Sequence, residues 1–151
     1  MQHCSLCDPS LSPVLAEYTH WRLALNRNQN LVGKCFLVLR RHAEAVPSLT
    51  ADEWVALHQH LGQAVAMLTA AFAPDHFNYA FLQNQDRHIH LHIIPRYAHP
   101  RQFMGGTFED RDYPSHYAVP APVRHLKPDE QVALAGQLRQ HLPAKFANAP
   151  S

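Results

Sequence analysis

The sequence lacks an excess of charge of either sign. Lys and Arg number 13, Asp and Glu 12, and the formal net charge is +1. A dedicated nucleic-acid coat or a polybasic membrane anchor needs a surplus of cations, so we expect no dedicated nucleic-acid binding and no membrane partner. No apolar run approaches the roughly 18 residues of a membrane span, and the first residues lack the charged start and apolar stretch of a secretory signal. We therefore expect a cytoplasmic protein.

Cysteine is scarce, and no internal repeat, low-complexity tract or Gly/Ser linker interrupts the chain. Only Cys4, Cys7 and Cys35 are present, and an odd count in a chain expected in the cytoplasm is a poor disulfide framework. The Cys4-x-x-Cys7 pair indicates metal or redox chemistry instead. Cys35 lies in an apolar run, where we expect it to be inert core. Histidine, by contrast, is abundant, with 13 residues scattered along the chain.

The length and composition predict one folded domain. A chain of 151 residues suits a single domain, and 46% hydrophobic against 17% charged residues excludes an intrinsically disordered chain. We expect strands at residues 17–25, 34–40, 76–83 and 87–94. The last two would form a hairpin around a short turn at 84–86. With two helices added, this order indicates an α+β domain spanning 1–151 with a mostly antiparallel sheet.

The clearest helix begins at a capping box. Thr50 and Glu53 have the spacing at which two side chains satisfy each other's backbone N–H groups, and Pro74 ends the helix. Its apolar stripe is predicted to comprise Trp54, Leu57, Leu61, Val65, Leu68 and Phe72. The solvated side is expected to carry the two histidines of this helix, His58 and His60.

The C-terminal third has a different character. Eight of the 12 prolines lie from Pro95 onward, and residues 97–127 are predicted to form an extended segment packed on the surface. A second helix is expected at about 128–142, with Pro128 in its first turn. Its apolar stripe would consist of Val132, Leu134, Leu138 and Leu142.

The strongest chemical signal is the segment at residues 88–94, in which three histidines alternate with aliphatic residues. Side chains alternate faces along a strand. We therefore expect His88, His90 and His92 on one face, about 6.6 Å apart at roughly 3.3 Å per residue. The core would receive the residues between them, Ile89, Leu91 and Ile93. A rigid row of imidazoles could bind an anionic group or form a group-transfer centre. The strict alternation favours this interpretation over a strand face that is merely solvated.

This segment resembles the signature His-φ-His-φ-His-φ-φ of the histidine triad (HIT) proteins, where φ is apolar, and matches it at every position. In addition, Asn26 lies seven residues before Gly33, as in members whose Asn contacts the nucleotide ribose region. The resemblance covers about residues 1–100 and leaves 101–151 as a C-terminal extension. It implies a HIT-like fold, with one long helix and a C-terminal helix, and a homodimer with a continuous sheet.

The resemblance also implies an activity. HIT proteins are nucleotide hydrolases and transferases that act at an α-phosphate, here of dinucleoside polyphosphates or nucleoside phosphoramidates. By position, His90 would be the nucleophile that forms a nucleotidyl-histidine intermediate. His92 would hydrogen-bond the phosphoryl oxygens or the leaving group, and His88 would support the site or bind a metal. A nucleotidyltransferase or phosphorylase with the same intermediate, and a non-enzymatic nucleotide- or zinc-binding module, remain alternatives.

Two features depart from the family pattern. Lys34 stands where many members have a histidine directly after the glycine, and it could either neutralise phosphate or be a surface lysine at the strand end. The turn before the triad is also short, so Asn84 or Gln85 could serve as the phosphate donors, with help from Arg87. These departures bear on the identity of the substrate more than on the class of reaction.

The resemblance further implies a zinc site. In some bacterial HIT proteins and related uridylyltransferases, an N-terminal Cys pair binds zinc with a strand-following His and the first triad His. The matching positions here are Cys4, Cys7, His42 and His88. Such a Cys₂His₂ site would be structural and closed, and it would tie the N-terminus to the sheet and orient His88. Two free cysteines in a mobile N-terminus, or a redox pair, are the alternatives.

Overall fold

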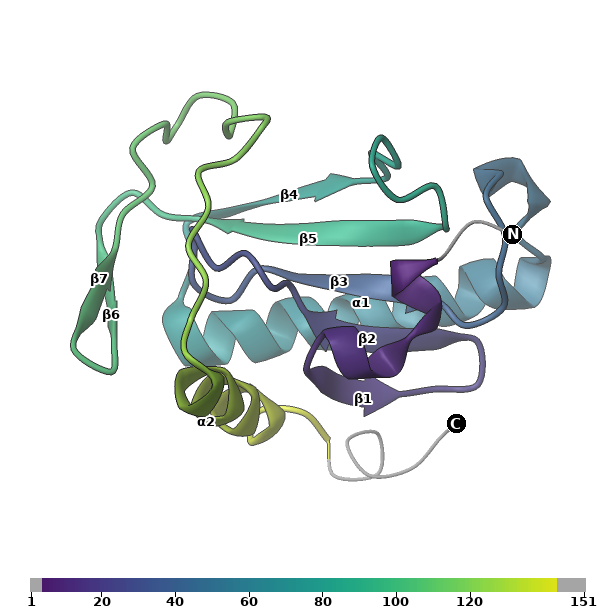
Figure 1. The fold of residues 1–151 in the computed structure, drawn as a ribbon, viewed down its shortest axis with the longest axis horizontal. Helices are drawn as coiled ribbons and strands as arrows, with labels where there is room; N and C mark the ends of the chain where they lie inside the picture. Colours follow the sequence, from purple (N-terminus) through teal and green to yellow (C-terminus); the bar gives the residue numbers. More distant parts are fainter. Residues whose placement is uncertain (1–3, 144–151) are drawn as a thin grey trace.

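The computed structural model of the chain describes residues 4–143. A five-stranded antiparallel sheet packs on one long helix, with a shorter helix and a small hairpin at one end (Figure 1). The order in the sheet is β1-β2-β3-β5-β4. Its strands are β1 (Val14–Glu17), β2 (Trp21–Leu25), β3 (Cys35–Leu39), β4 (His76–Ala80) and β5 (His90–Arg96). The predicted α+β class with a mostly antiparallel sheet is confirmed.

The remaining elements flank this sheet. The helices are α1 (Ala51–Phe72) and α2 (Pro128–Arg139), and a separate hairpin consists of β6 (Arg101–Phe103) and β7 (Gly106–Phe108). Three short 3-10 turns complete the description: η1 (Ser5–Cys7), η2 (Pro9–Leu11) and η3 (Val46–Ser48). In the part of the chain that is described, no helix has the length and apolar content needed to cross a membrane.

The strand predicted at 17–25 is two strands joined by a turn. The backbone N–H of Tyr18 donates to the carbonyl of Trp21 at 2.9 Å, which closes the turn between β1 and β2. Both residues are fully buried. The apolar content that suggested one continuous strand therefore reflects burial of the turn itself.

One face of the sheet forms the main core. Leu23 pairs with Leu37, which pairs with Leu91, so one row of leucines crosses three neighbouring strands. All three are buried in the same hydrophobic cluster as Leu57 and Leu68 of α1. This apolar layer fixes the register of the central strands, because a slip by one residue would turn every side chain to the opposite face.

Helix α1 begins as predicted, but its buried face is turned relative to the expected stripe. The capping box is present, with Glu53 N–H donating to Thr50 Oγ1 at 3.1 Å and Thr50 N–H to a Glu53 carboxylate oxygen at 2.8 Å. Glu53 also binds Arg41 at 2.7 Å and lies on the inner side of the first turn. Trp54 is consequently turned outward and is 43% exposed, whereas His60, predicted on the solvated side, is buried.

The hairpin of β4 and β5 exists, but the predicted short turn at 84–86 is a nine-residue connection, 81–89. Gln83 has a positive φ of 51°, and its side-chain amide donates to the carbonyls of Glu44 and Arg87, both at 2.6 Å. Ile89 N–H donates to Ala43 O at 2.8 Å instead of extending the ladder with β4. His88 therefore precedes strand β5, which begins at His90.

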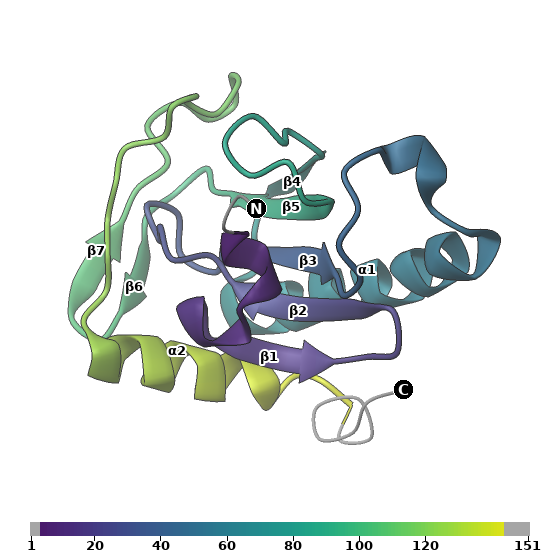
Figure 2. The same cartoon turned by 45° about the vertical axis from the view of Figure 1, so that its right-hand side comes forward.

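The C-terminal extension is more ordered than predicted. Residues 97–127 include the β6–β7 hairpin, whose turn has positive φ at Met104 and Gly105. A buried ion pair between Arg96 and Asp110, at 2.6 Å, anchors the segment that follows β7. That segment then runs past one end of the sheet to α2 (Figure 2).

Helix α2 ends earlier than predicted, and its buried face differs from the expected stripe at one residue. It stops at Arg139 and not at residue 142, although Leu142 is itself buried. Val132 of the expected stripe is 71% exposed, so its inclusion was wrong. The face that packs toward α1 and β1 is built from Leu134, Ala135 and Leu138.

Candidate functional site

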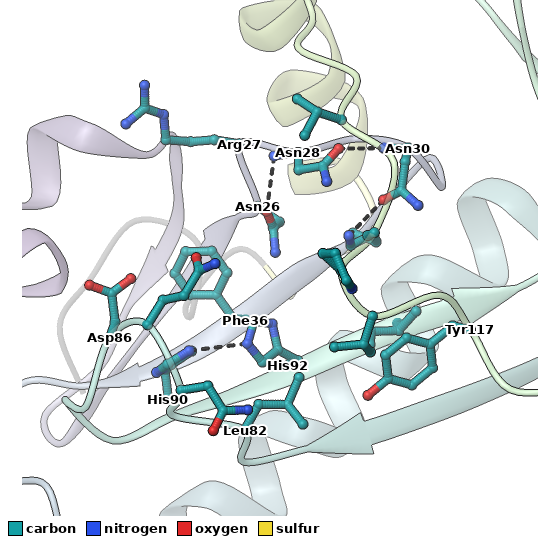
Figure 3. Close-up of a pocket in the computed structure, with 18 of the residues that line it drawn as sticks. Asn26, Arg27, Asn28, Asn30, Phe36, Leu82, Asp86, His90, His92 and Tyr117 are labelled. Carbon is teal, nitrogen blue, oxygen red and sulfur yellow. Dashed lines mark hydrogen bonds between the residues drawn. The ribbon is translucent and has the colours of Figure 1, made fainter.

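A cavity of about 680 Å³ opens on the sheet face opposite the main core. Its floor comes from strands β3 and β5, through Phe36, His90 and His92. Four separate segments surround this floor: the N-terminal turns, the loop at 26–34, the connection at 81–89, and the C-terminal segment at 117–123. Figure 3 shows the two histidines between Asn26–Asn30 on one side and Leu82 and Asp86 on the other.

His90 is held in a defined tautomer. Its Nδ1 lies 2.7 Å from the backbone oxygen of His88, and a carbonyl oxygen can only accept, so His90 Nδ1 carries the hydrogen. In the neutral ring Nε2 then keeps its lone pair. This nitrogen faces the cavity and lies 3.1 Å from Nε2 of His92. A buried imidazole whose Nδ1–H is fixed on a carbonyl and whose Nε2 lone pair faces the cavity is the arrangement required of a nucleophile.

His92 is predominantly neutral near pH 7. Burial first, and then the neighbouring charges of His90 and Lys34, lower the pKa of His92 to about 4. A neutral His92 can donate one N–H while the neighbouring His90 accepts it. Its position beside His90 on the same strand face was predicted from the alternating pattern.

Lys34 points into the same cavity. It is buried, and its Nζ donates to Asn30 Oδ1 at 2.6 Å. Removal from water lowers the pKa of Lys34 to about 8. The interpretation of Lys34 as a surface lysine at a strand end is therefore wrong. In the part of the chain that is described, no carboxylate forms an ion pair with Lys34.

The loop that carries Lys34 is built around Gln29, which sequence reasoning missed. Gln29 is buried, donates to the carbonyls of Asn26 and Lys34 at 2.7 and 2.8 Å, and accepts from Gly33 N–H at 2.8 Å. Gly33 itself has a φ of +95°, and a Cβ there would lie 2.8 Å from Leu68. The loop can therefore adopt this course only with glycine at that position.

The four predicted substrate-binding residues all line this cavity: Asn26, Lys34, Asn84 and Gln85. The Asn26 side chain accepts from the backbone of Asn28 at 2.9 Å, which leaves its amide N–H₂ available toward the cavity. Asn84 and Gln85 are exposed on the connection at 81–89. Arg87 is exposed and does not belong to the lining.

The predicted metal ligands come together beside this cavity. One ligand atom each from Cys4, Cys7, His42 and His88 lies within 4.8 Å of all the others. The Cys4 and Cys7 sulfurs are 3.3 and 3.4 Å from His88 Nδ1, and the two Nδ1 atoms are 3.2 Å apart. A tetrahedron with bonds of about 2.0–2.3 Å places its ligand atoms roughly 3.3–3.8 Å apart. The donor set therefore fits zinc, and the three separations of 3.2–3.4 Å lie close to this range.

His88 joins the metal cluster to the row of histidines. Its Nε2 lies 2.6 Å from the Leu39 carbonyl and must donate to it, which leaves the Nδ1 lone pair for a metal. Burial lowers the pKa of His88, which favours the neutral, ligand-competent ring. The carbonyl of the same residue orients His90. His88 lies just before β5, and its ring is directed to the cysteines of the turn that borders the cavity, so the three histidines divide between the metal cluster and the cavity.

Comparison with known proteins identifies the fold. No protein-family model and no curated protein matches the sequence. Among solved structures, a histidine triad protein from Sinorhizobium meliloti matches with a TM-score of 0.72 at 19% identity, covering 89% of this chain and 95% of that one. One from Bradyrhizobium japonicum matches with a TM-score of 0.72 at 18% identity, covering 95% and 98%.

The chain has the histidine triad fold. A Zn-bound histidine triad family protein from Mycobacterium smegmatis is also similar, with a TM-score of 0.57 at 18% identity over 91% of this chain and 94% of that one. The implied HIT-like fold, with one long helix and a C-terminal helix, is thereby confirmed. At these identities the likeness extends to the fold, and the chemistry has to be argued from this chain's own residues.

Proposed function

We propose that the protein is a nucleotide hydrolase that cleaves at an α-phosphate through a nucleotidyl-histidine intermediate on His90. One observation carries this proposal: His90 Nδ1–H is fixed on the His88 carbonyl while Nε2 faces a cavity large enough for a small molecule. The histidine triad fold, which includes proteins described as nucleotide-binding, agrees with this assignment.

The reaction would proceed in two displacements. The lone pair of His90 Nε2 attacks the α-phosphorus, a P–N bond forms, and the bond to the leaving group breaks with its electron pair. Water then attacks the same phosphorus and releases a proton to the solvent. The P–N bond breaks with its electron pair returning to Nε2, which restores neutral His90. His92 N–H can donate to the phosphoryl oxygens or the leaving group, and the Lys34 ammonium can neutralise negative charge beside them.

The substrate class follows from the pocket lining. Among the lining residues, Arg27 and Lys34 are cationic, and the carboxylate of Asp86 is engaged by Ser5 Oγ at 2.8 Å. Asn26, Asn84 and Gln85 offer amide groups to a ribose or phosphate. Dinucleoside polyphosphates and nucleoside phosphoramidates both fit this lining. Transfer of the nucleotidyl group to phosphate or a sugar phosphate, in place of water, is the second candidate, because the cavity is open to another anionic acceptor.

Zinc at Cys4, Cys7, His42 and His88 belongs to the same proposal, as a structural ion. The donor set supports zinc, and the Mycobacterium smegmatis protein is zinc-bound. A cytoplasmic location and a homodimer complete the proposal. Exposed Trp54 and Val55 on α1 offer apolar surface that a second subunit could cover.

The test is a turnover assay with a matched histidine control. Diadenosine tetraphosphate, adenosine phosphoramidate and adenylyl sulfate are offered to wild type, His90→Ala and His58→Ala, with and without inorganic phosphate. His58 is exposed on α1 and is not among the residues that line the cavity, so His58→Ala should behave as wild type. We expect turnover that His90→Ala abolishes, and the phosphate dependence separates hydrolase from phosphorylase. Tight nucleotide binding without turnover by wild type would contradict an enzymatic role and support a binding module.

A further inference from the structure

The two residues between the paired cysteines form part of the pocket wall. Ser5 and Leu6 lie in η1, between Cys4 and Cys7, and both line the cavity. Ser5 Oγ donates to an Asp86 carboxylate oxygen at 2.8 Å. Asp86 lies on the connection at 81–89, so this hydrogen bond links two walls of the cavity that are 81 residues apart in sequence.

Leu6 reaches the floor of the cavity. It packs on a small apolar cluster of Ala24, Phe36 and Val38 that is separate from the main core. The Phe36 ring in turn stands edge-on to both histidines, with centroid distances of 6.1 Å to His90 and 6.3 Å to His92. The position of Leu6 therefore shapes the space directly in front of the proposed nucleophile.

Within residues 4–143, this turn makes one side-chain hydrogen bond to the rest of the protein besides the contacts of its two thiols. Its own backbone hydrogen bonds are local: Cys7 N–H donates to Cys4 O at 3.2 Å, and Asp8 N–H to Ser5 O at 3.3 Å. Ordering a chain segment costs conformational entropy for every residue fixed. One side-chain hydrogen bond and one partly buried leucine offset little of that cost. A metal that joins both cysteines to the sheet supplies the missing attachment.

We infer that Ser5 and Leu6 form a metal-dependent wall of the nucleotide pocket, so that zinc binding at the four-residue cluster and nucleotide binding strengthen each other. The inference rests on the proposed nucleotide-binding function and extends it. Zinc fixes both ends of the Cys4–Cys7 turn, and the turn then presents Leu6 to the floor and Ser5 to Asp86. Because linkage is reciprocal, the factor by which zinc tightens the nucleotide must equal the factor by which the nucleotide tightens zinc.

The experiment measures both affinities. Binding of AMP, used as the probe, is followed by calorimetry on zinc-loaded and zinc-free wild type at buffered free zinc. Zinc affinity is measured by competition with a chromophoric chelator, with and without AMP. We expect zinc removal to weaken AMP binding by roughly tenfold, within the usual range of coupling between sites. AMP should tighten zinc by the same factor. Equal AMP affinity in both states would overturn the inference and leave the proposed function intact.

A double variant distinguishes coupling through Ser5 and Leu6 from coupling through His88. Ser5→Ala/Leu6→Ala keeps all four metal ligands. Ser10→Ala is the matched control, because among residues 4–143 the Ser10 hydroxyl bonds only Asp8, and Ser10 does not line the cavity. In the double variant the coupling factor should fall toward one. At saturating zinc it should bind AMP roughly tenfold more weakly than zinc-loaded wild type, a readout that does not require the zinc-free protein to stay folded.

Two results would contradict the inference in different ways. Persistence of the full coupling in the double variant would show that zinc acts through His88 and its carbonyl to His90. Absence of AMP binding to wild type in every zinc state would contradict the proposed nucleotide function itself, and the inference with it.

Discussion

The two faces of the sheet differ in what they bury, although the same strands build both. On one face Leu23, Leu37 and Leu91 form a continuous buried apolar row, in the same hydrophobic core as residues of α1. On the other face the neighbouring row is Ala24, Phe36 and His92, of which Phe36 and His92 line the cavity. The apolar face fixes the strand register. The open face can therefore carry polar residues in fixed positions without itself providing the stability of the fold.

The largest expected effect of a substitution is therefore on stability, from a residue of the apolar face. Leu37→Ala should lower the free energy of unfolding by about 2–5 kcal/mol, because a fully buried leucine is replaced by a cavity. Urea denaturation measures this, with His90→Ala as the comparison on the opposite face of the sheet. Comparable destabilisation by the two variants would show that the open face is as important for stability as the core.

A smaller effect is expected at the cavity, where Lys34 is proposed to neutralise the charge of the phosphate. Lys34→Met should lower kcat/KM by about 10²-fold, as removal of a transition-state donor typically does, with the fold retained. Because the pKa of Lys34 is lowered to about 8, kcat/KM of wild type should decline as pH rises through about 8 and the ammonium is lost.

Lys34→Arg is the matched variant for that pH dependence. Guanidinium stays protonated in this range, so any activity that Lys34→Arg retains should lack the decline above pH 8. The same decline in Lys34→Arg would assign the titration to another group and remove Lys34 from the charge-neutralising role.

The smallest expected effect concerns His60, a polar residue buried on the apolar side of the sheet. His60 of α1 is buried and stacks on Tyr18 with ring centroids 3.6 Å apart. Burial lowers the pKa of His60 below its ordinary value of 6.5. The unfolded chain then binds this proton more readily than the folded one, so the contribution of His60 to stability is complete above pH 6.5 and is lost as pH falls below it.

His60→Phe should keep the stacking and make the loss of stability between pH 7 and pH 5 shallower. His58→Phe, on the exposed side of the same helix, should leave the slope unchanged. His88 and His92 also have lowered pKa values and contribute to the slope of every protein, so only the difference between variants reports on His60. Identical slopes in all three proteins would show that protonation of His60 does not oppose folding.

The sequence predicted what depends on local periodicity. Alternation placed His90 and His92 on one face with an aliphatic back, and the capping box placed the start of α1. The family resemblance supplied the four metal positions, whose side chains the structure brings together. These signals are short-range or belong to a motif, so they can be recognised without knowledge of the tertiary structure.

The missed features depend on contacts between distant segments. Ser5 meets Asp86 across 81 residues, and the Arg124 backbone donates to Asn28 across 96. No periodic pattern marks such pairs. The burial of Lys34 depends on the loop that precedes it, which Gln29 holds by hydrogen bonds to Gly33 and Lys34. The polar composition of residues 26–33 gave no sign of this burial. The outward turn of Trp54 follows from the inward pairing of Glu53, another contact outside the helical pattern.

The central claim is that His90 forms a covalent bond to the nucleotide, and the most direct measurement is mass spectrometry of the protein during the first turnover. Wild type is mixed with diadenosine tetraphosphate or adenosine phosphoramidate, quenched rapidly under non-acidic denaturing conditions, and digested. The account predicts the added mass of one nucleotidyl group on the peptide that contains residue 90, at His90, and no adduct in His90→Ala. Turnover by wild type with no adduct at any time, or an adduct that persists in His90→Ala, would contradict it.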